Sequence, residues 1–181
     1  MEQGFVKVAS ATPRIRVADP VYNAQVICEQ AKEAAEHGAK IVVFPELCIT
    51  GYTCNDLFLQ ELLLEKAKEA LLTIAEETGQ LETLFLVGLP VDKDGRLYNV
   101  AAVLYRGRIL GMIPKKNIPM YAEFYEGRHF TPGEETVTEY RLGKQVIPFG
   151  SNLLFRCEEL PELILGCELC EDLWVAEPPS T

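Results

Sequence analysis

Apolar runs of strand length alternate with amphipathic stretches of helix length in the first half of the chain. The run at 40–44 is continuous and apolar, which is typical of a strand buried on both faces of a sheet. It lies between two stretches, 20–37 and 57–78, whose apolar residues recur at helical spacing. This order of strand, helix, strand and helix, followed by several strands in succession, predicts an α/β fold with a mixed sheet.

Turn residues set the expected limits of these elements. Asp19 and Pro20 are typical of a helix start, and Gly38 and Gly79 of the two helix ends. The stretch 114–150 has no clear period, so we expect an irregular functional loop region there. We expect strands at 5–9, 40–44, 84–89, 98–105, 109–113, 153–155 and 163–165, with the last strand ending near the cysteine at 170.

Charge and hydropathy restrict the partners that the chain can have. The net charge is -10 and the sequence pI is about 4.8, so we expect no binding to nucleic acid or to anionic membranes. No apolar run approaches the roughly 20 residues that cross a bilayer, and the first residues lack the features of a signal peptide. We therefore expect a cytoplasmic protein whose six cysteines are reduced thiols.

Three of the expected strands are followed by a reactive side chain: Glu46, Lys115 and Cys170. Side chains at strand ends face a shared crevice in an α/β sheet. A lysine there would favour a thiolate and stabilise an oxyanion, and a partly buried carboxylate could pass the thiol proton to a leaving amine. Each residue alone is also compatible with a solvated carboxylate, a surface charge or a core cysteine, and their spacing does not join them.

Four motifs occur in order across nearly the whole chain. They are Phe-Pro-Glu-Leu with Thr-Gly-Tyr at 44–52, Tyr-Asn at 98–99 followed by Gly-Arg and Pro-Lys up to 115, Glu-Gly-Arg-His-Phe-Thr-Pro-Gly at 126–133, and Gly-Cys-Glu-Leu-Cys-Glu-Asp-Leu-Trp at 166–174. Together they resemble the nitrilase, or carbon–nitrogen hydrolase, superfamily. The resemblance implies a nitrilase-like α-β-β-α sandwich that becomes four-layered on dimerisation. It also implies that Glu46 is the general base, Lys115 the oxyanion-stabilising lysine and Cys170 the nucleophile.

A narrower resemblance comes from Pro-Met-Tyr-Ala-Glu-Phe-Tyr-Glu at 119–126 and Cys-Glu-Asp-Leu-Trp at 170–174. Both segments are similar to the N-terminal glutaminase domain of the glutamine-dependent NAD synthetase family. The resemblance implies that glutamine is the substrate and that its ammonia amidates nicotinic acid adenine dinucleotide to NAD. The residues that it places in or near the glutamine pocket are Tyr121, Phe124, Glu171, Tyr52 and Glu126, with Glu171 as the contact for the substrate ammonium.

The chain departs from this family in its extent. The family joins the glutaminase to an ATP-dependent synthetase domain, and no Ser-Gly-Gly-x-Asp-Ser loop of that domain occurs here. We therefore expect residues 1–181 to be the N-terminal part of the glutaminase domain. The C-terminal part, and the synthetase domain that uses ATP and Mg, would be missing. The domain itself should need no cofactor or metal, its partners should be the synthetase domain and further copies in a homo-oligomer, and the isolated chain should have little or no glutaminase turnover.

Three alternative functions stay open. A free-standing nitrilase-superfamily amidase or carbamoylase acting on a small amide would use the same three residues. A metal or redox module could be built on Cys167 and Cys170, although we expect Cys167 inside the strand and facing opposite to Cys170. A catalytically silent interaction domain would contain no selectively reactive thiol. The roles of Cys48 and Cys54, close to Glu46, also stay open.

Overall fold

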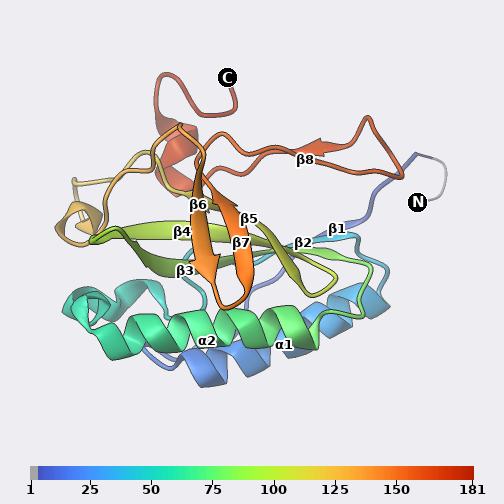
Figure 1. Cartoon of the computed structure of the whole chain (residues 1–181), viewed down its shortest axis with the longest axis horizontal. Helices are drawn as coiled ribbons and strands as arrows, with labels where there is room; N and C mark the ends of the chain where they lie inside the picture. Colours follow the sequence, from blue (N-terminus) through green and yellow to red (C-terminus); the bar gives the residue numbers. More distant parts are fainter. Residues whose placement is uncertain (1–3) are drawn as a thin grey trace.

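The computed structural model describes residues 4–181 and contains one seven-stranded sheet (Figure 1). The strand order is β1-β2-β3-β4-β5-β7-β6. The first three strands pair in parallel, β3, β4 and β5 form an antiparallel meander, and β7 joins β5 in parallel. The strands are β1 (Val8–Ser10), β2 (Ile41–Val43), β3 (Leu84–Lys93), β4 (Arg96–Tyr105), β5 (Arg108–Pro114), β6 (Thr138–Leu142) and β7 (Gln145–Phe149).

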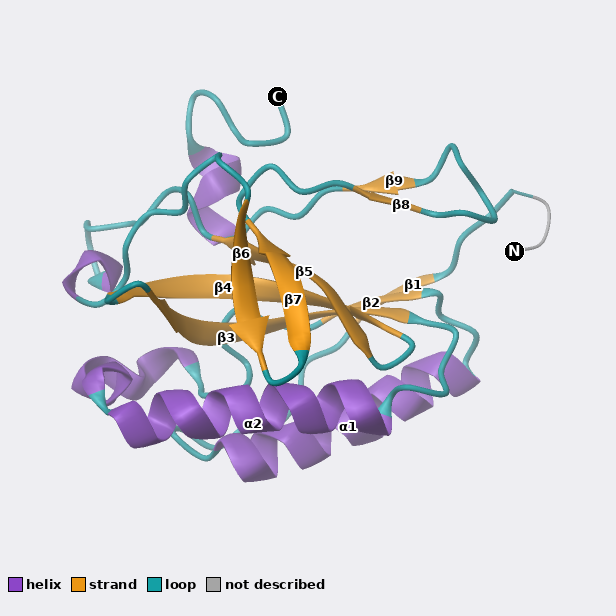
Figure 2. Ribbon diagram, viewed as in Figure 1, coloured by secondary structure: helices purple, strands orange, loops and turns teal. Residues whose placement is uncertain are grey.

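Two helices, α1 (Pro20–Glu36) and α2 (Glu61–Glu77), lie side by side on one face of this sheet (Figure 2). Asp19 caps α1, because its carboxylate accepts the backbone N–H of Tyr22 at 3.1 Å. Pro20 occupies the first turn, where its missing N–H costs no intrahelical hydrogen bond. The prediction of a first helix beginning at this Asp-Pro pair is confirmed.

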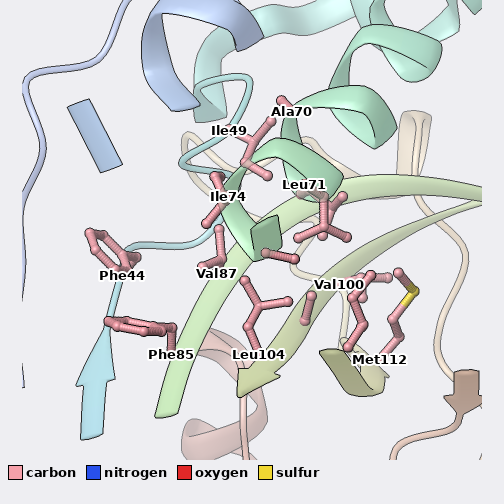
Figure 3. Close-up of a cluster of buried hydrophobic side chains, with 14 of the residues drawn as sticks. Phe44, Ile49, Ala70, Leu71, Ile74, Phe85, Val87, Val100, Leu104 and Met112 are labelled. Atoms are coloured by element: carbon pink, nitrogen blue, oxygen red, sulfur yellow. The ribbon is translucent and has the colours of Figure 1, made fainter. Parts of the chain in front are cut away.

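The main core fills the space between the helices and the sheet. Leu71 and Ile74 of α2 lie close to Val87 of β3 and Leu104 of β4, and all four are fully buried (Figure 3). Burying a side chain of this size contributes about 1.5–3 kcal/mol. The sheet is therefore fixed firmly to the helices, and the ends of its strands become a rigid platform.

The other face of the sheet is covered by the last part of the chain (Figure 2). A small hairpin of β8 (Phe155–Arg156) and β9 (Ile164–Leu165) lies here, followed by the 3-10 turn η3 (Cys170–Trp174). Phe155 packs against the buried cluster formed by Ala101, Val103, Ile113 and Leu169. The cover is incomplete, since Val43 of β2 is 45% exposed. The expectation that the strand at 40–44 is buried on both faces is therefore wrong for Val43.

The second helix is shorter than its apolar pattern predicts. The 3-10 segment η1 (Tyr52–Leu59) precedes it, and α2 begins only at Glu61, four residues after the expected start. Gln60 has a φ of -87° and a ψ of 118°, an extended conformation that separates η1 from α2. The apolar spacing continues through Leu57 and Leu59, so a prediction from periodicity alone places the start of the helix too early.

The stretch 114–150 is less irregular than expected. It contains the hairpin of β6 and β7 as well as the 3-10 turn η2 (Glu126–Arg128). Tyr140 and Ile147 pair across this hairpin and are buried, while their neighbours along each strand are exposed. The hairpin thus has the period of two that indicates strands, and the expectation of a loop there was wrong.

The last strand also ends earlier than expected. β9 stops at Leu165, so Cys167 lies outside it and Cys170 opens η3 instead of ending a strand. None of the helices in residues 4–181 is long and apolar enough to cross a bilayer.

A glycine of β3 supports the loop after β2. A Cβ atom on Gly88 would lie 2.4 Å from the backbone nitrogen of Leu47 and 2.7 Å from the backbone oxygen of Pro45. The backbone oxygen of Gly88 accepts the N–H of Ile49 at 3.1 Å. The turn that carries Glu46 therefore rests directly on a residue without a side chain.

We predict that Gly88→Ala destabilises the protein by about 1–3 kcal/mol, because both backbones must move to make room for the methyl group. Urea unfolding measures this difference. Gly166→Ala is the matched control, since a Cβ there would meet only the Leu154 side chain at 3.4 Å. Equal stability losses in the two variants would contradict the close approach at Gly88.

Candidate active site

A buried lysine lies at the centre of the site. Lys115 directly follows β5, and its backbone N–H donates to the Asn99 carbonyl of β4 at 2.8 Å. Its side chain is 0% exposed. Nζ lies 2.8 Å from Glu46 Oε1, 2.8 Å from Glu126 Oε1 and 2.9 Å from Glu126 Oε2. Burial alone would lower the pKa of Lys115, but its hydrogen bonds to Glu126 and Glu46 outweigh it and raise that pKa above its usual value.

Glu46 reaches the lysine from the loop after β2. Its Oε1 also accepts a hydrogen bond from Asn99 Nδ2 at 2.6 Å, and its side chain is 19% exposed. Burial raises the pKa of Glu46, and the hydrogen bond from Lys115 opposes that rise. The next residue, Leu47, has a φ of 53°, a strained conformation for a branched side chain. The tight turn aims Glu46 at the end of β5.

Glu126 supplies the second carboxylate from η2. It is buried, and the hydroxyl of Tyr52 donates to its Oε1 at 2.8 Å. Burial and this hydrogen bond both raise the pKa of Tyr52, which keeps the phenol protonated. The structure therefore places Tyr52 and Glu126 beside Lys115.

Cys170 is the first residue of η3 and has a φ of 48°. Burial raises the pKa of its thiol, the charge of Glu46 raises it further, and the charge of Lys115 lowers it. The thiol thus lies within electrostatic reach of both charges. The structure brings Glu46, Lys115 and Cys170 into one site, and the thiol is protonated at rest, so a reaction at sulfur needs a base.

Asp172 joins the cysteine turn to the lysine loop. It is 2% exposed, and its carboxylate accepts the backbone N–H groups of Leu169 at 3.1 Å, Lys116 at 3.2 Å and Asn117 at 2.7 Å. The side-chain amide of Asn117 donates to it as well, at 2.9 Å. Sequence reasoning missed this role, although a carboxylate at the third position of a helical turn can reach back to the N-cap backbone N–H, as in a capping box.

Three further predicted residues gather beside the cysteine. The hydroxyl of Tyr121 donates to Glu171 Oε2 at 2.7 Å, and the rings of Tyr121 and Phe124 stack edge to face with centroids 5.7 Å apart. The hydrogen bond to Glu171 and burial raise the pKa of Tyr121, and a thiolate at Cys170 would raise it further. Tyr121, Phe124 and Glu171 therefore form one partly exposed cluster next to the thiol.

The other cysteines near the site make different contacts. Cys48 donates to the Gly88 carbonyl and Cys54 to the Thr50 carbonyl, and burial raises the pKa of Cys48 and of Cys167 to about 12. No group of three or more His, Cys, Asp or Glu side chains that could hold a metal ion occurs among residues 4–181.

Comparisons with known proteins agree with this geometry. The carbon–nitrogen hydrolase family matches residues 7–179. The chain belongs to the carbon–nitrogen hydrolase family. The resemblance to the nitrilase superfamily is thereby confirmed, and so is the expected α/β fold. The dimeric four-layer sandwich stays a prediction.

Relatives within the carbon–nitrogen hydrolase family are longer than this chain. The glutamine-dependent NAD(+) synthetase of Mycobacterium tuberculosis (strain ATCC 25618 / H37Rv) is 40% identical over 99% of the chain, which spans only 26% of that relative. The crystal structure of a glutamine-dependent NAD(+) synthetase from Cytophaga hutchinsonii has 29% identity and a TM-score of 0.84, over 92% of this chain and 28% of that one. An amidase from Nesterenkonia sp. shares the fold, with 24% identity, a TM-score of 0.60, and coverage of 79% of this chain and 54% of that one.

We predict that Asp172→Asn lowers the free energy of unfolding by about 2–3 kcal/mol, the scale of lost hydrogen bonds to a buried charge. The asparagine amide has only one oxygen, so its NH₂ group would face backbone N–H groups that need an acceptor. Urea unfolding measures the loss. Glu168→Gln is the matched control, since Glu168 accepts one exposed hydrogen bond, from the Ser180 backbone. A loss of stability no larger than that of the control would contradict the role of Asp172 in joining the cysteine turn to the lysine loop.

We also predict a pH effect on the alkylation of Cys170 by a small neutral reagent. Because its pKa is raised, the reaction is slow at pH 7 and its rate still rises beyond the pKa of free cysteine. Glu46→Gln removes a negative charge that raises this pKa. The pH–rate curve should therefore move to lower pH, and the rate at pH 7 should increase roughly severalfold. Loss of the reaction in Cys170→Ala shows that Cys170 is the alkylated thiol. A pH–rate curve unchanged in Glu46→Gln would contradict the effect of the Glu46 charge on the pKa of Cys170.

Proposed function

We propose that the chain is the N-terminal part of the glutaminase domain of a glutamine-dependent NAD synthetase. In this function it would release ammonia from glutamine for the amidation of nicotinic acid adenine dinucleotide. One observation carries the proposal: a fully buried Lys115 is held between Glu46 and Glu126 beside a thiol that opens a strained turn. This arrangement offers a base, a cation and a nucleophile in one place, which acyl transfer through sulfur requires.

The first chemical step forms a thioester. Glu46 takes the proton of the Cys170 thiol, and the sulfur attacks the carbonyl carbon of the glutamine side-chain amide. The carbonyl electrons move to oxygen, and the Lys115 ammonium stabilises that oxyanion together with a backbone N–H after Cys170. Removing one such donor typically slows a reaction by about 10²–10³-fold. Glu46 then gives its proton to nitrogen, the C–N bond breaks and ammonia leaves.

The second chemical step uses water. Glu46, again a carboxylate, takes a proton from a water molecule that attacks the thioester carbon. The C–S bond breaks, glutamate is released and the thiol of Cys170 regains a proton. Glu46 therefore has to gain and lose a proton twice in each cycle, which suits a carboxyl whose pKa is raised above its usual value.

The partly exposed cluster beside the thiol fits the other end of glutamine. Glu171 is a carboxylate whose position is fixed by the Tyr121 hydroxyl. It would bind the substrate ammonium, while the rings of Tyr121 and Phe124 would contact the substrate's methylene groups. These contacts would distinguish glutamine from simple amides, which a free-standing amidase or carbamoylase would accept instead.

The remaining parts of the function belong to the complete protein. We propose that a synthetase domain uses ATP and Mg, that this domain and glutamine are the partners of the chain, and that the protein forms homo-oligomers in the cytoplasm. The glutaminase domain itself would need no cofactor. The acidic net charge of -10 supports the proposed lack of nucleic-acid and membrane partners. In isolation, the chain would have little glutaminase turnover.

A glutamine-like chloroketone tests the proposed chemistry. We predict that it labels Cys170 first among the six cysteines and that excess glutamine slows the labelling. Mass spectrometry of the digested chain locates the label. In the complete protein, Cys170→Ala should abolish ammonia release from glutamine. Uniform labelling of several cysteines would instead favour a silent interaction domain.

We predict that Glu171→Gln raises the KM for glutamine by about 10-fold or more, because a substrate ammonium loses its charged partner. The kcat for a simple amide such as butyramide should change little. Steady-state assays of the complete protein with both substrates measure this difference. Glu168→Gln is the control, since that neighbouring carboxylate contacts the Ser180 backbone. Similar activity on glutamine and simple amides in the unsubstituted protein would favour the amidase alternative.

A further inference from the structure

Asn99 lies between the two carboxylates of the site, although sequence reasoning gave it no role. It lies on β4 and is fully buried. Its Nδ2 donates to Glu46 Oε1 at 2.6 Å and lies 3.5 Å from Glu126 Oε2. Its backbone carbonyl accepts the N–H of Lys115. Asn99 thus contacts both carboxylates through its side chain and the backbone of Lys115 through its own backbone carbonyl.

The orientation of the Asn99 amide is determined by these carboxylates. Its Oδ1 is buried without a hydrogen-bond partner among residues 4–181. Leaving an acceptor unpaired costs free energy. The opposite orientation would place Oδ1 against the carboxylate oxygens, which repel it. Oδ1 therefore stays unpaired, because only this orientation lets Nδ2 donate to the carboxylates.

The two oxygens of Glu46 consequently differ. Oε1 accepts from both Lys115 Nζ and Asn99 Nδ2. Oε2 has no hydrogen-bond partner among the described residues. It is also absent from the set of fully buried polar atoms without a partner, so it is not completely shielded from solvent. A proton added to Oε1 would displace one of two short hydrogen bonds, whereas a proton added to Oε2 displaces none.

We propose that Asn99 is a positioning residue for Glu46, whose amide fixes Oε1 beside Lys115 and leaves Oε2 as the oxygen that exchanges a proton with Cys170. In that exchange the S–H bond breaks, an O–H bond forms at Oε2, and the electron pair of the S–H bond stays on sulfur. The charge of Glu46 raises the pKa of the thiol, so the carboxylate lies within electrostatic reach of Cys170. The inference rests on the proposed function only in taking Cys170 as the proton donor.

Asn99 also favours the ionised form of Glu46. A hydrogen bond donated to a carboxylate lowers its pKa, and Asn99 opposes in this way the rise in the pKa of Glu46 that burial causes. Before the reaction Glu46 must be ionised to take a proton. Asn99 would therefore keep the base ready at neutral pH.

Asn99→Leu tests the inference, because leucine has a similar shape and no polar atom. The backbone bond from Lys115 to residue 99 does not depend on the side chain and should remain. In the chain labelled with ¹³C at the glutamate carboxyl, NMR follows the titration of Glu46, whose signal is the one absent from Glu46→Gln. We expect its midpoint to move up by about one pH unit, the size of one charge-assisted hydrogen bond.

Two further variants make the result specific. Asn23→Leu is the matched control, since Asn23 is equally buried but donates to the backbone carbonyls of Arg16 and Ile49. It should lose stability without moving the Glu46 midpoint. If Asn99→Leu does not fold, Asn99→Ser removes the amide with a smaller side chain and should move the midpoint in the same direction.

Kinetics of the complete protein separate positioning from a structural role. With glutamine, Asn99→Leu should move the acid limb of the kcat/KM profile to higher pH by the same amount as the NMR midpoint. A uniform fall in rate, with the limbs of the kcat/KM profile and the NMR midpoint of Glu46 both unchanged, would overturn the inference. If the unsubstituted protein released no ammonia from glutamine while the midpoint still moved, the proposed function would fail and the effect of Asn99 on Glu46 would stand.

Discussion

The buried ammonium group of Lys115 is the constraint on which the rest of the site depends. Removing a cation from water costs several kcal/mol unless anions and hydrogen-bond acceptors replace the solvent. Here Glu46 and Glu126 supply three oxygens within 2.9 Å of Nζ. The loop after β2, the end of β5 and the η2 turn must therefore meet at one point. Removing either carboxylate would leave a buried charge poorly compensated.

Burial and the excess of negative charge around this lysine explain the state of the thiol. Burial raises the pKa of Cys170 most, and the charges of Glu46 and Glu126 raise it further against the opposing charge of Lys115, so the sulfur keeps its proton at rest. A protonated thiol resists oxidation better than a thiolate does. The same arrangement makes catalysis depend on a proton acceptor, and Glu46 is the carboxylate whose pKa burial raises. The reactivity of the sulfur is thus coupled to an acid–base group.

Backbone geometry holds these groups in place. Leu47 and Cys170 both have positive φ values, and such strain persists only where surrounding contacts fix it. Gly88 leaves room for the turn at Leu47, and Asp172 binds the N–H groups on both sides of the contact between the cysteine turn and the lysine loop. The free energy stored at these turns is therefore balanced by packing on β3 and by one buried carboxylate.

The sequence by itself determined the first helix and the strands of the central meander, and its motifs gave the prediction of Glu46, Lys115 and Cys170 as site residues. Periodicity and motifs are local, so they are visible without coordinates. Only the tertiary structure showed that α2 begins at Glu61, that a hairpin lies at 138–149, and that Asp172 and Asn99 hydrogen-bond to residues of the site. The reason is physical: Lys115 and Glu46 are 69 residues apart in the chain, and their hydrogen bond, like the protonation of the thiol, depends on contacts that no local pattern encodes.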